Sequence, residues 1–359
     1  MPHEVTLAGR RIGPDSPVFV VAEVSANHNQ SIERAEAILR AAKDAGADAV
    51  KLQTYTPDTM TLDCDAPWFR IKGTIWDGMR LHDLYRQAMT PWEWYPRLRD
   101  VARELGIVIF STPFDATAVD FLESMDTPLH KVASFELVDL PLLRRIAGTG
   151  KPVIMSTGMA TQGEIAEAVD CLRAVGTTDL VLLHCVSAYP APPEQMRLRA
   201  IPLLADLFGV PSGLSDHSHG HLAAVAGVAL GARLIEKHIT LSRNDPGPDS
   251  SFSMEPHEFR EMVKAIRTTE KALGEPKLEP SERESASRAL RRSLFAVEDI
   301  RAGERFTEAN VRSLRPGLGL HTRHMEDVLS SRARVDIGRG TPLSMDLLAQ
   351  TDPEHEGTR

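Results

Sequence analysis

Cysteine is scarce in this chain of 359 residues, and its placement excludes two classes of protein. The three cysteines, Cys64, Cys171 and Cys185, are far apart in sequence, and no CxxC pair occurs. An odd number of separated cysteines excludes a disulfide framework and a thiolate zinc site. Free cysteines are typical of a reducing compartment, so we expect a cytoplasmic location.

Long apolar segments and an excess of basic residues are also missing. No apolar run approaches the roughly 18 residues that span a bilayer, and the N-terminus lacks the apolar core of a signal peptide. The formal net charge is -9, whereas non-specific nucleic-acid binding needs a basic surface. We therefore expect neither a membrane nor a nucleic acid as partner. An anionic substrate is still compatible with this charge, because a few local lysines can override the global sign.

What the sequence does contain is a repeated alternation of apolar runs and amphipathic helices. Buried parallel strands read as continuous apolar runs because both faces are covered. The predicted strands are Val18–Glu23, Ala47–Leu52, Ile107–Ser111, His130–Ser134, Val153–Ser156, Leu180–Cys185, Val210–Ser215 and Arg233–His238. The clearest helical periodicity covers Ile32–Ala45, Trp92–Leu105, Glu164–Val175, Leu222–Leu230 and Glu258–Leu273.

Eight strands that alternate with helices over about 275 residues predict an α/β fold, a (β/α)8 TIM barrel. The alternative is a doubly wound open sheet. That fold would place a GxGxxG turn after an early strand, and the chain has none there.

One connection is too long for a simple loop between strand and helix. The stretch Thr54–Pro91 carries Trp68, Phe69, Trp76 and Tyr85, so we expect it to be ordered. Long loops at this end of a barrel are usually functional. The alternative is a lid whose aromatic side chains only seal the barrel.

The alternation ends near Gly274, which indicates a second domain. Residues 274–287 are polar and contain proline, as linkers do, and the block that follows has short β-like runs and no long helix. We predict a barrel domain over 1–280, a linker over 281–290, a small β-rich domain over 291–350 and a disordered tail over 351–359. The small core of the second domain predicts docking on the barrel or on a partner chain.

Polar side chains follow the apolar parts of the predicted strands, where barrel enzymes build their active sites. Cations and hydroxyl groups on one rim suit a phosphate, whose oxygens accept several charge-assisted hydrogen bonds. A single serine at a strand end is usually a turn or cap residue, but a whole set is harder to explain that way. The set comprises Lys51, Lys131, Ser134, Ser156, Ser187 and Ser215.

Two histidines and one carboxylate complete the predicted rim. His217 and His238 end adjacent strands and could share a divalent metal with waters or carboxylates. The alternative is a pair of hydrogen-bonded core histidines. Glu23 could move a proton to or from a substrate oxygen. Its alternative role is an ion pair with Lys51 or Lys131.

These motifs resemble the sialic acid synthase family, also called the NeuB family. The matching stretches are AEVSANHN, AGADAVKLQT, FSTPFD, HKVASFEL, IMSTGM, LLHCVSAYPAPP, GLSDHS, IEKHIT and GPDSSFS. The block RRSLFAVEDIRAGERFT resembles the antifreeze-like (SAF) domain that follows the barrel in this family. The stretches KLQTYTPDTMTLDCD, GTIWDG and TPWEWY are similar to the pseudaminic acid branch.

The resemblance implies a condensation of phosphoenolpyruvate with the open-chain aldehyde of an N-acetylated amino sugar. C3 of the enol attacks the aldehyde, water attacks C2, and phosphate leaves by C–O cleavage. The branch implies 2,4-diacetamido-2,4,6-trideoxy-L-altrose as the sugar, with N-acetylneuraminate or legionaminate synthesis as alternatives. More remote alternatives are a non-catalytic sugar-binding protein and a metal-dependent aldolase that acts on pyruvate.

The resemblance also assigns residues. It implies Glu23 as the acid or base, and His217 and His238 as ligands of a divalent metal, Mn2+ first, with Mg2+ or Co2+ as alternatives. Phosphoenolpyruvate would bind the lysines and serines named above. The sugar would contact Gln53, Tyr189 and Asp249. Arg315 of the SAF domain would reach the N-acetyl group in a domain-swapped homodimer.

Overall fold

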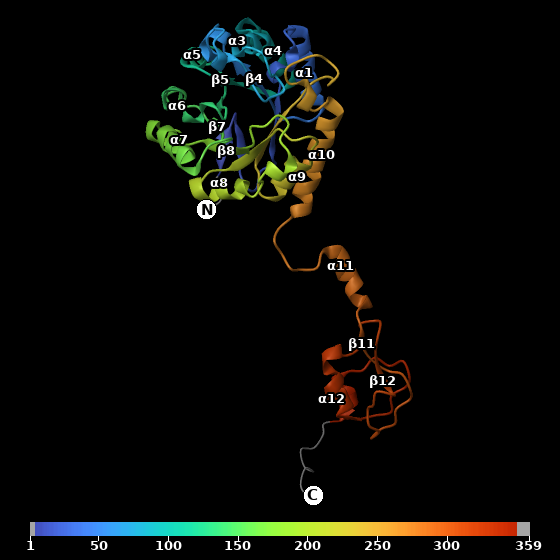
Figure 1. Ribbon diagram of the computed structural model, residues 1–359. Helices are drawn as coiled ribbons and strands as arrows, with labels where there is room; N and C mark the ends of the chain where they lie inside the picture. Colours follow the sequence, from blue (N-terminus) through green and yellow to red (C-terminus); the bar gives the residue numbers. More distant parts are fainter. Residues whose placement is uncertain (1–3, 350–359) are drawn as a thin grey trace. The chain divides into compact units, whose positions relative to one another are not determined.

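A closed barrel of eight parallel strands forms the centre of the first of two compact units, residues 1–274 and 275–359. The computed structural model describes residues 4–349 (Figure 1). Around the barrel the strands run in the order β10-β3-β4-β5-β6-β7-β8-β9. They are β3 (Phe19–Glu23), β4 (Ala49–Thr54), β5 (Val108–Pro113), β6 (His130–Val132), β7 (Val153–Ser156), β8 (Leu180–Cys185), β9 (Ser212–Asp216) and β10 (Leu234–His238). The predicted barrel is confirmed, with strand ends that differ from the prediction by at most two residues.

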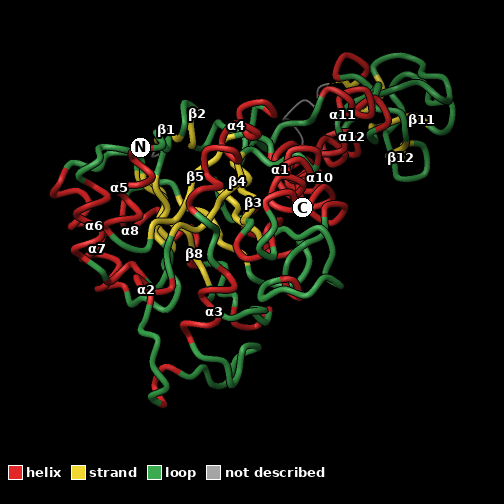
Figure 2. The backbone as a smooth tube through the Cα atoms, turned by 90° about the horizontal axis from the view of Figure 1, so that it is seen from above, coloured by secondary structure: helices red, strands yellow, loops and turns green. Residues whose placement is uncertain are grey.

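Helices surround these strands (Figure 2). They are α1 (Ile32–Asp44), α4 (Tyr95–Leu105), α5 (Ala116–Ser124), α6 (Leu140–Ala147), α7 (Gln162–Val175), α8 (Ala200–Phe208), α9 (Leu222–Ala229) and α10 (Pro256–Leu273). All five of the clearest predicted helices are present. The short helices α5 and α6 begin at carboxylate caps, because Asp115 accepts from the backbone of Thr117 and Ala118, and Asp139 from that of Leu142.

Side chains on each strand alternate between the barrel interior and the layer beneath the helices. On β3, Phe19 and Val21 belong to the interior cluster, whereas Val20 and Ala22 pack in the cluster that includes helix residues. Because the period is two, the next inward position on β3 is Glu23. The apolar interior therefore ends on a charged residue.

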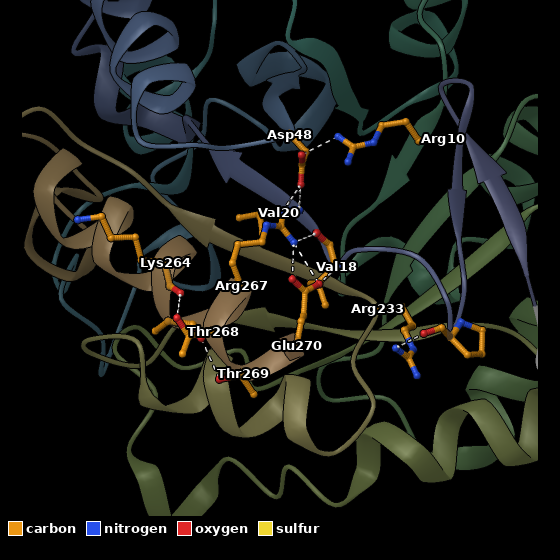
Figure 3. A network of polar contacts seen from close by, with 12 residues as sticks. Arg10, Val18, Val20, Asp48, Arg233, Lys264, Arg267, Thr268, Thr269 and Glu270 are labelled. Atoms are coloured by element: carbon orange, nitrogen blue, oxygen red, sulfur yellow. Dashed lines mark hydrogen bonds and ion pairs between the residues drawn. The ribbon is translucent and has the colours of Figure 1, made fainter. Parts of the chain in front are cut away.

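A hairpin and a charged network lie at the N-terminal end of the barrel. Strands β1 (Val5–Leu7) and β2 (Arg10–Ile12) pair antiparallel, and Leu7 and Ile12 join the interior cluster. We call Arg10, Asp48, Arg267 and Glu270 the basal network (Figure 3). Asp48 accepts from Arg10 Nη1 at 2.6 Å and from Arg267 Nη2 at 3.0 Å.

The basal network also holds the backbone at the start of β3. Val20 N–H donates to Asp48 Oδ2 at 2.9 Å, and Val18 N–H donates to Glu270 Oε1 at 2.5 Å. Arg267 Nη1 donates to the Val18 carbonyl at 2.9 Å. Helix α10 is thereby fastened to the first barrel strand.

Residues 54–91, which we call the insertion, fold between β4 and α4. They contain α2 (Pro57–Met60), a 3-10 turn (Pro67–Phe69) and α3 (Leu81–Ala88), as expected of an ordered segment. Arg80 fastens the insertion internally, with ion pairs of 2.7 Å to both Asp83 and Asp63.

The second unit contains short strands around a small apolar core. Its elements are α11 (Glu282–Ser287), β11 (Ser293–Ala296), β12 (Val311–Leu314), α12 (Met325–Leu329), β13 (Arg332–Ala333) and β14 (Leu348–Ala349). Helix α11 lies in the segment predicted as a linker and begins at a capping box of Ser281 and Glu284. The predicted tail over 351–359 lies outside the described residues. Within residues 4–349 no helix combines the length and apolarity that a membrane span requires.

Candidate active site

A cavity of about 480 Å³ lies at the C-terminal ends of the barrel strands. Most of the predicted site residues line it together, although they come from all parts of the barrel sequence. They are Glu23, Lys51, Gln53, Lys131, Ser134, Ser156, Tyr189, Ser215, His217, His238 and Asp249. Ser187 and Arg315 are absent from this lining.

The alternation of the strands explains why these side chains converge. On β10, Leu234 lies in the interior cluster, and Glu236 and His238 are the next two inward positions. On β7, Ile154 precedes Ser156 in the same way. Each polar group therefore lies one pleat beyond the apolar interior, at the end that faces the cavity.

A buried cluster of charge joins β3, β4 and β10. Lys51 Nζ lies 2.7 Å from Glu23 Oε2 and 3.7 Å from Glu236 Oε1. The ion pair between Glu23 and Lys51, one of the two pairings expected for Glu23, is therefore present. Burial raises the pKa of Glu23 to about 7, although Lys51 opposes this shift. Such a carboxyl group can give or take a proton near neutral pH.

Lys131 on β6 forms a second cationic position, two strands from Lys51 on β4. Its Nζ donates to Ser156 Oγ at 2.7 Å and to the Val132 carbonyl at 2.8 Å. Burial is the main influence and lowers the pKa of Lys131. The two cavity lysines thus differ, because Lys51 is paired with carboxylates and Lys131 with neutral oxygens.

Ser134 and Ser187 flank Gly158 from two sides. Ser134 Oγ accepts the Gly158 N–H at 3.0 Å, and a Cβ on Gly158 would lie 2.7 Å from Ser134 Oγ and closer still to Ser187 Oγ. Only Ser134 lines the main cavity, whereas Ser187 lines a neighbouring one together with His184 and Arg197. Ser187 thus lines a different cavity from the other predicted phosphate ligands, although its Oγ lies 3.9 Å from the Sγ of Cys185, which lines both cavities.

The rings of His217 and His238 lie 5.4 Å apart between centroids. The Nδ1 of His217 lies 3.0 Å from the Val186 carbonyl, so it carries the hydrogen and leaves Nε2 with a lone pair. The Nδ1 of His238 is buried without a hydrogen-bond partner. Among residues 4–349 no group of three or more His, Cys, Asp and Glu side chains is placed to hold a metal. The pair fits a metal whose other ligands are water and substrate.

A hydrogen-bonded chain links the predicted sugar contacts. Gln53 Nε2 donates to Glu23 Oε1 and to Ser25 Oγ, each at 2.9 Å. Ser25 Oγ in turn donates to Asp249 Oδ2 at 2.5 Å. Tyr189 stacks on the ring of His217, with 4.3 Å between centroids. Glu23 is thus connected to the side of the cavity where we expect the sugar.

Asn27 and His28 shape the turn that follows Glu23. Asn27 Nδ2 donates to the Ile239 carbonyl and to Ser253 Oγ, both at 2.9 Å. His28 is buried, and its two ring nitrogens contact the Gln30 N–H and Thr90 Oγ1. Burial, followed by Arg34, lowers the pKa of His28 to about 4. Both side chains therefore hold this turn through hydrogen bonds.

Sequence reasoning assigned no role to several residues that line the cavity. Glu236 could have been found from its position two residues before His238 on one strand face. Glu136 has an unpartnered buried Oε2 and, through burial above all, a pKa raised to about 7. Cys185 also lines the cavity. For the insertion residues at the cavity, no local pattern indicated which ones turn inward.

Arg315 belongs to the second unit. It follows β12 and is exposed in that unit. Its predicted contact with the sugar therefore stays a prediction.

Known proteins resemble the chain over nearly its whole length. The NeuB family matches residues 38–277, and the SAF domain matches residues 291–349. A "Pseudaminic acid synthase" of Helicobacter pylori is 46% identical over 332 residues, 92% of this chain and 97% of that protein. An "N,N'-diacetyllegionaminic acid synthase" of Legionella pneumophila is 35% identical over 92% of this chain and 94% of that protein.

A solved structure agrees with this result. The N-acetylneuraminic acid synthetase of Leptospira borgpetersenii, crystallised with citrate, has a TM-score of 0.72 and 32% identity. The match covers 80% of this chain and 95% of that one. The two family matches agree with the barrel unit and the second unit of the structure. The chain belongs to the NeuB family.

Proposed function

We propose that this protein condenses phosphoenolpyruvate with 2,4-diacetamido-2,4,6-trideoxy-L-altrose to give pseudaminic acid and phosphate. The observation that carries the proposal is one cavity that combines a carboxyl group with a pKa of about 7, two buried lysines, four serines and two imidazoles. The 46% identity to the pseudaminic acid synthase of Helicobacter pylori supports this sugar over its relatives.

The lysines and serines supply the groups that an anionic substrate needs. Lys131 with Ser156, and Lys51 with Ser215 nearby on β9, can hold the phosphate and carboxylate of phosphoenolpyruvate. Preorganised cations stabilise the charge that develops as phosphate leaves. Ser134 would add a hydroxyl, and so would Ser187, which lies beside the same Gly158 but lines the neighbouring cavity.

Glu23 is the group that we propose for proton transfer. Its contacts with Lys51 and Gln53 fix its orientation, and its pKa of about 7 suits both directions of transfer. Gln53, Tyr189 and Asp249 would orient the sugar, so that both substrates are held in register and much of the entropic cost of a bimolecular step is avoided.

His217 and His238 would hold a divalent metal, Mn2+ foremost, with Mg2+ and Co2+ as alternatives. When bound, such an ion acts as a Lewis acid toward an aldehyde oxygen. Chelation with EDTA should stop phosphate release, and added Mn2+ should restore it. Full activity after thorough chelation would contradict the metal proposal.

Arg315 would complete the sugar site from the SAF domain of a second copy, in a domain-swapped homodimer. Mixing Arg315→Ala with an inactive Glu23→Gln variant tests this arrangement. If the domain acts in trans, a mixed dimer contains one intact barrel that receives an intact Arg315, and activity rises on mixing. Activity that stays at the level of the separate variants would place Arg315 in cis or away from the site.

One assay tests the main proposal. Phosphate release is measured with phosphoenolpyruvate and each of three sugars, namely the altrose, N-acetylmannosamine and the legionaminic precursor. We expect the altrose to give the highest kcat/KM. Release with another sugar only would move the protein to another branch, and turnover of pyruvate in place of phosphoenolpyruvate would indicate an aldolase. No turnover of any donor would favour a sugar-binding protein.

A cytoplasmic setting stays a prediction from the free cysteines.

A further inference from the structure

The cavity has two chemically different halves. The strand ends contribute its charged and hydroxyl-bearing part. A group of apolar side chains comes from the insertion and from the turn after β6. We call this group the apolar wall, and it consists of Met60, Ile71, Trp76, Leu81, Leu84 and Phe135. Five of these six residues lie in the insertion.

Trp76 connects the apolar wall to the predicted sugar contacts. Trp76 Nε1 donates to the Pro248 carbonyl at 3.0 Å, and Pro248 directly precedes Asp249. The ring of Trp76 lies 6.0 Å from that of Tyr189 between centroids. Trp76 therefore lies beside Tyr189 and next to Asp249, in the same cavity as the other wall residues.

Phe135 is the most exposed residue of the apolar wall, so packing within the fold does not explain its large apolar side chain. It follows Ser134 at the end of β6 and lines the cavity, yet 60% of its surface is exposed. A large exposed aromatic side chain gains little from the fold, and one that lines a cavity can contact the apolar surface of a ligand.

We propose that the apolar wall binds the methyl-bearing C6 end of the sugar and thereby selects 6-deoxy sugars. This inference rests on the proposed function and names the part of the substrate that the insertion recognises. With the aldehyde at the histidines, the remaining carbons of the open chain extend away from the polar strand ends. A methyl group at C6 can be buried against apolar side chains, whereas a C6 hydroxyl there would lose its water without a partner.

The expected preference for the 6-deoxy sugar can be estimated from the discrimination that apolar pockets achieve in other enzymes. Such pockets reject an analogue with one added hydroxyl by about 100-fold at most. We therefore expect kcat/KM for the 6-deoxy altrose to exceed that for the same diacetamido sugar with a 6-hydroxyl by roughly 10- to 100-fold.

The test compares these two sugars in the wild type and in Phe135→Ala and Ile71→Asn variants. Phe135 is exposed and Ile71 is half-buried, so both variants should fold, which circular dichroism and the melting temperature verify. We expect each variant to lower the kcat/KM ratio of 6-deoxy to 6-hydroxy sugar by about tenfold, with the KM for phosphoenolpyruvate unchanged.

Trp68→Ala is the matched control. Trp68 lies in the same insertion but is 77% exposed and outside the cavity lining, so its removal should leave the sugar ratio unchanged. A wild-type ratio near one, or a ratio that neither wall variant alters, would overturn the inference while turnover of the altrose leaves the proposed function standing. Absence of turnover with both sugars would instead overturn the proposed function together with the inference.

Discussion

Carboxylates and cations lie together at both ends of the barrel, but in different surroundings. At the N-terminal end, Arg10, Asp48, Arg267 and Glu270 keep side-chain exposures between 14% and 40%. At the C-terminal end, Glu23, Glu236 and Lys51 keep at most 7%, and Lys131 is buried. Charged side chains are therefore partly exposed to solvent at the N-terminal end and almost fully buried at the C-terminal end.

Hydrogen bonding separates the two ends as well. The basal network binds backbone groups of Val18 and Val20, and its four side chains all take part in hydrogen bonds. At the other end, Glu236 Oε2, Glu136 Oε2 and His238 Nδ1 are buried without partners. Unpaired buried polar atoms destabilise a fold, and because these three belong to residues that line the cavity, they indicate a site arranged for ligands.

The largest effect should come from Glu23→Gln. This change keeps the size of the side chain but removes its ability to transfer a proton, so phosphate release should fall by about 1000-fold. The melting temperature should change little, because the variant removes a buried charge and Glu236 still faces Lys51. Stopped assays of phosphate release and a thermal melt measure both quantities.

Glu270→Gln is the matched control at the N-terminal end. It removes a carboxylate from the basal network and should leave the kcat of the folded protein unchanged. If Glu270→Gln reduced kcat as strongly as Glu23→Gln, the assignment of catalysis to the C-terminal end alone would be wrong.

A large stability effect should come from Asp48→Ala. This change leaves Arg10, Arg267 and the Val20 N–H without their shared acceptor, so the free energy of unfolding should fall by about 3 kcal/mol. Urea unfolding measures the loss, and kcat per folded molecule should stay the same. Asp100→Ala, which removes an exposed pair with Arg103, should cost less than about 0.5 kcal/mol. Equal losses in the two variants would show that the basal network adds no stability.

The smallest effect concerns His28, a buried group at the functional end with both nitrogens paired. Its pKa is about 4 in the folded protein and about 6.5 in the unfolded chain. Because the folded pKa is lowered, its contribution to stability is complete above pH 6.5 and is lost as the pH falls toward 4. At pH 5 the loss should be about 2 kcal/mol.

His28→Gln isolates this contribution. The variant should lose less stability between pH 7 and pH 5 than the wild type in urea titrations, with little change in the pH dependence of kcat. A shifted pH profile of kcat with an unchanged pH dependence of stability would instead make His28 part of the chemistry.

Local sequence was sufficient for the barrel and for most of the cavity. Apolar runs locate the strands, and the period of two then determines which of their residues turn inward, as for Glu23, Lys51 and His238. Helices α5 and α6 were not among the clearest predicted helices, although α9, which is equally short, was.

Contacts between distant segments decided what the sequence could not. Ser187 lies two residues beyond β8 and beside Gly158, and it lines the neighbouring cavity and not the main one. Trp76 faces the site because its indole reaches the Pro248 carbonyl, 172 positions along the chain, whereas neighbouring Trp68 stays outside. Sequence alone determined which chemistry stands at the strand ends, because a strand's alternation is a local property. The tertiary structure decided which insertion side chains face the sugar, because that depends on long-range packing.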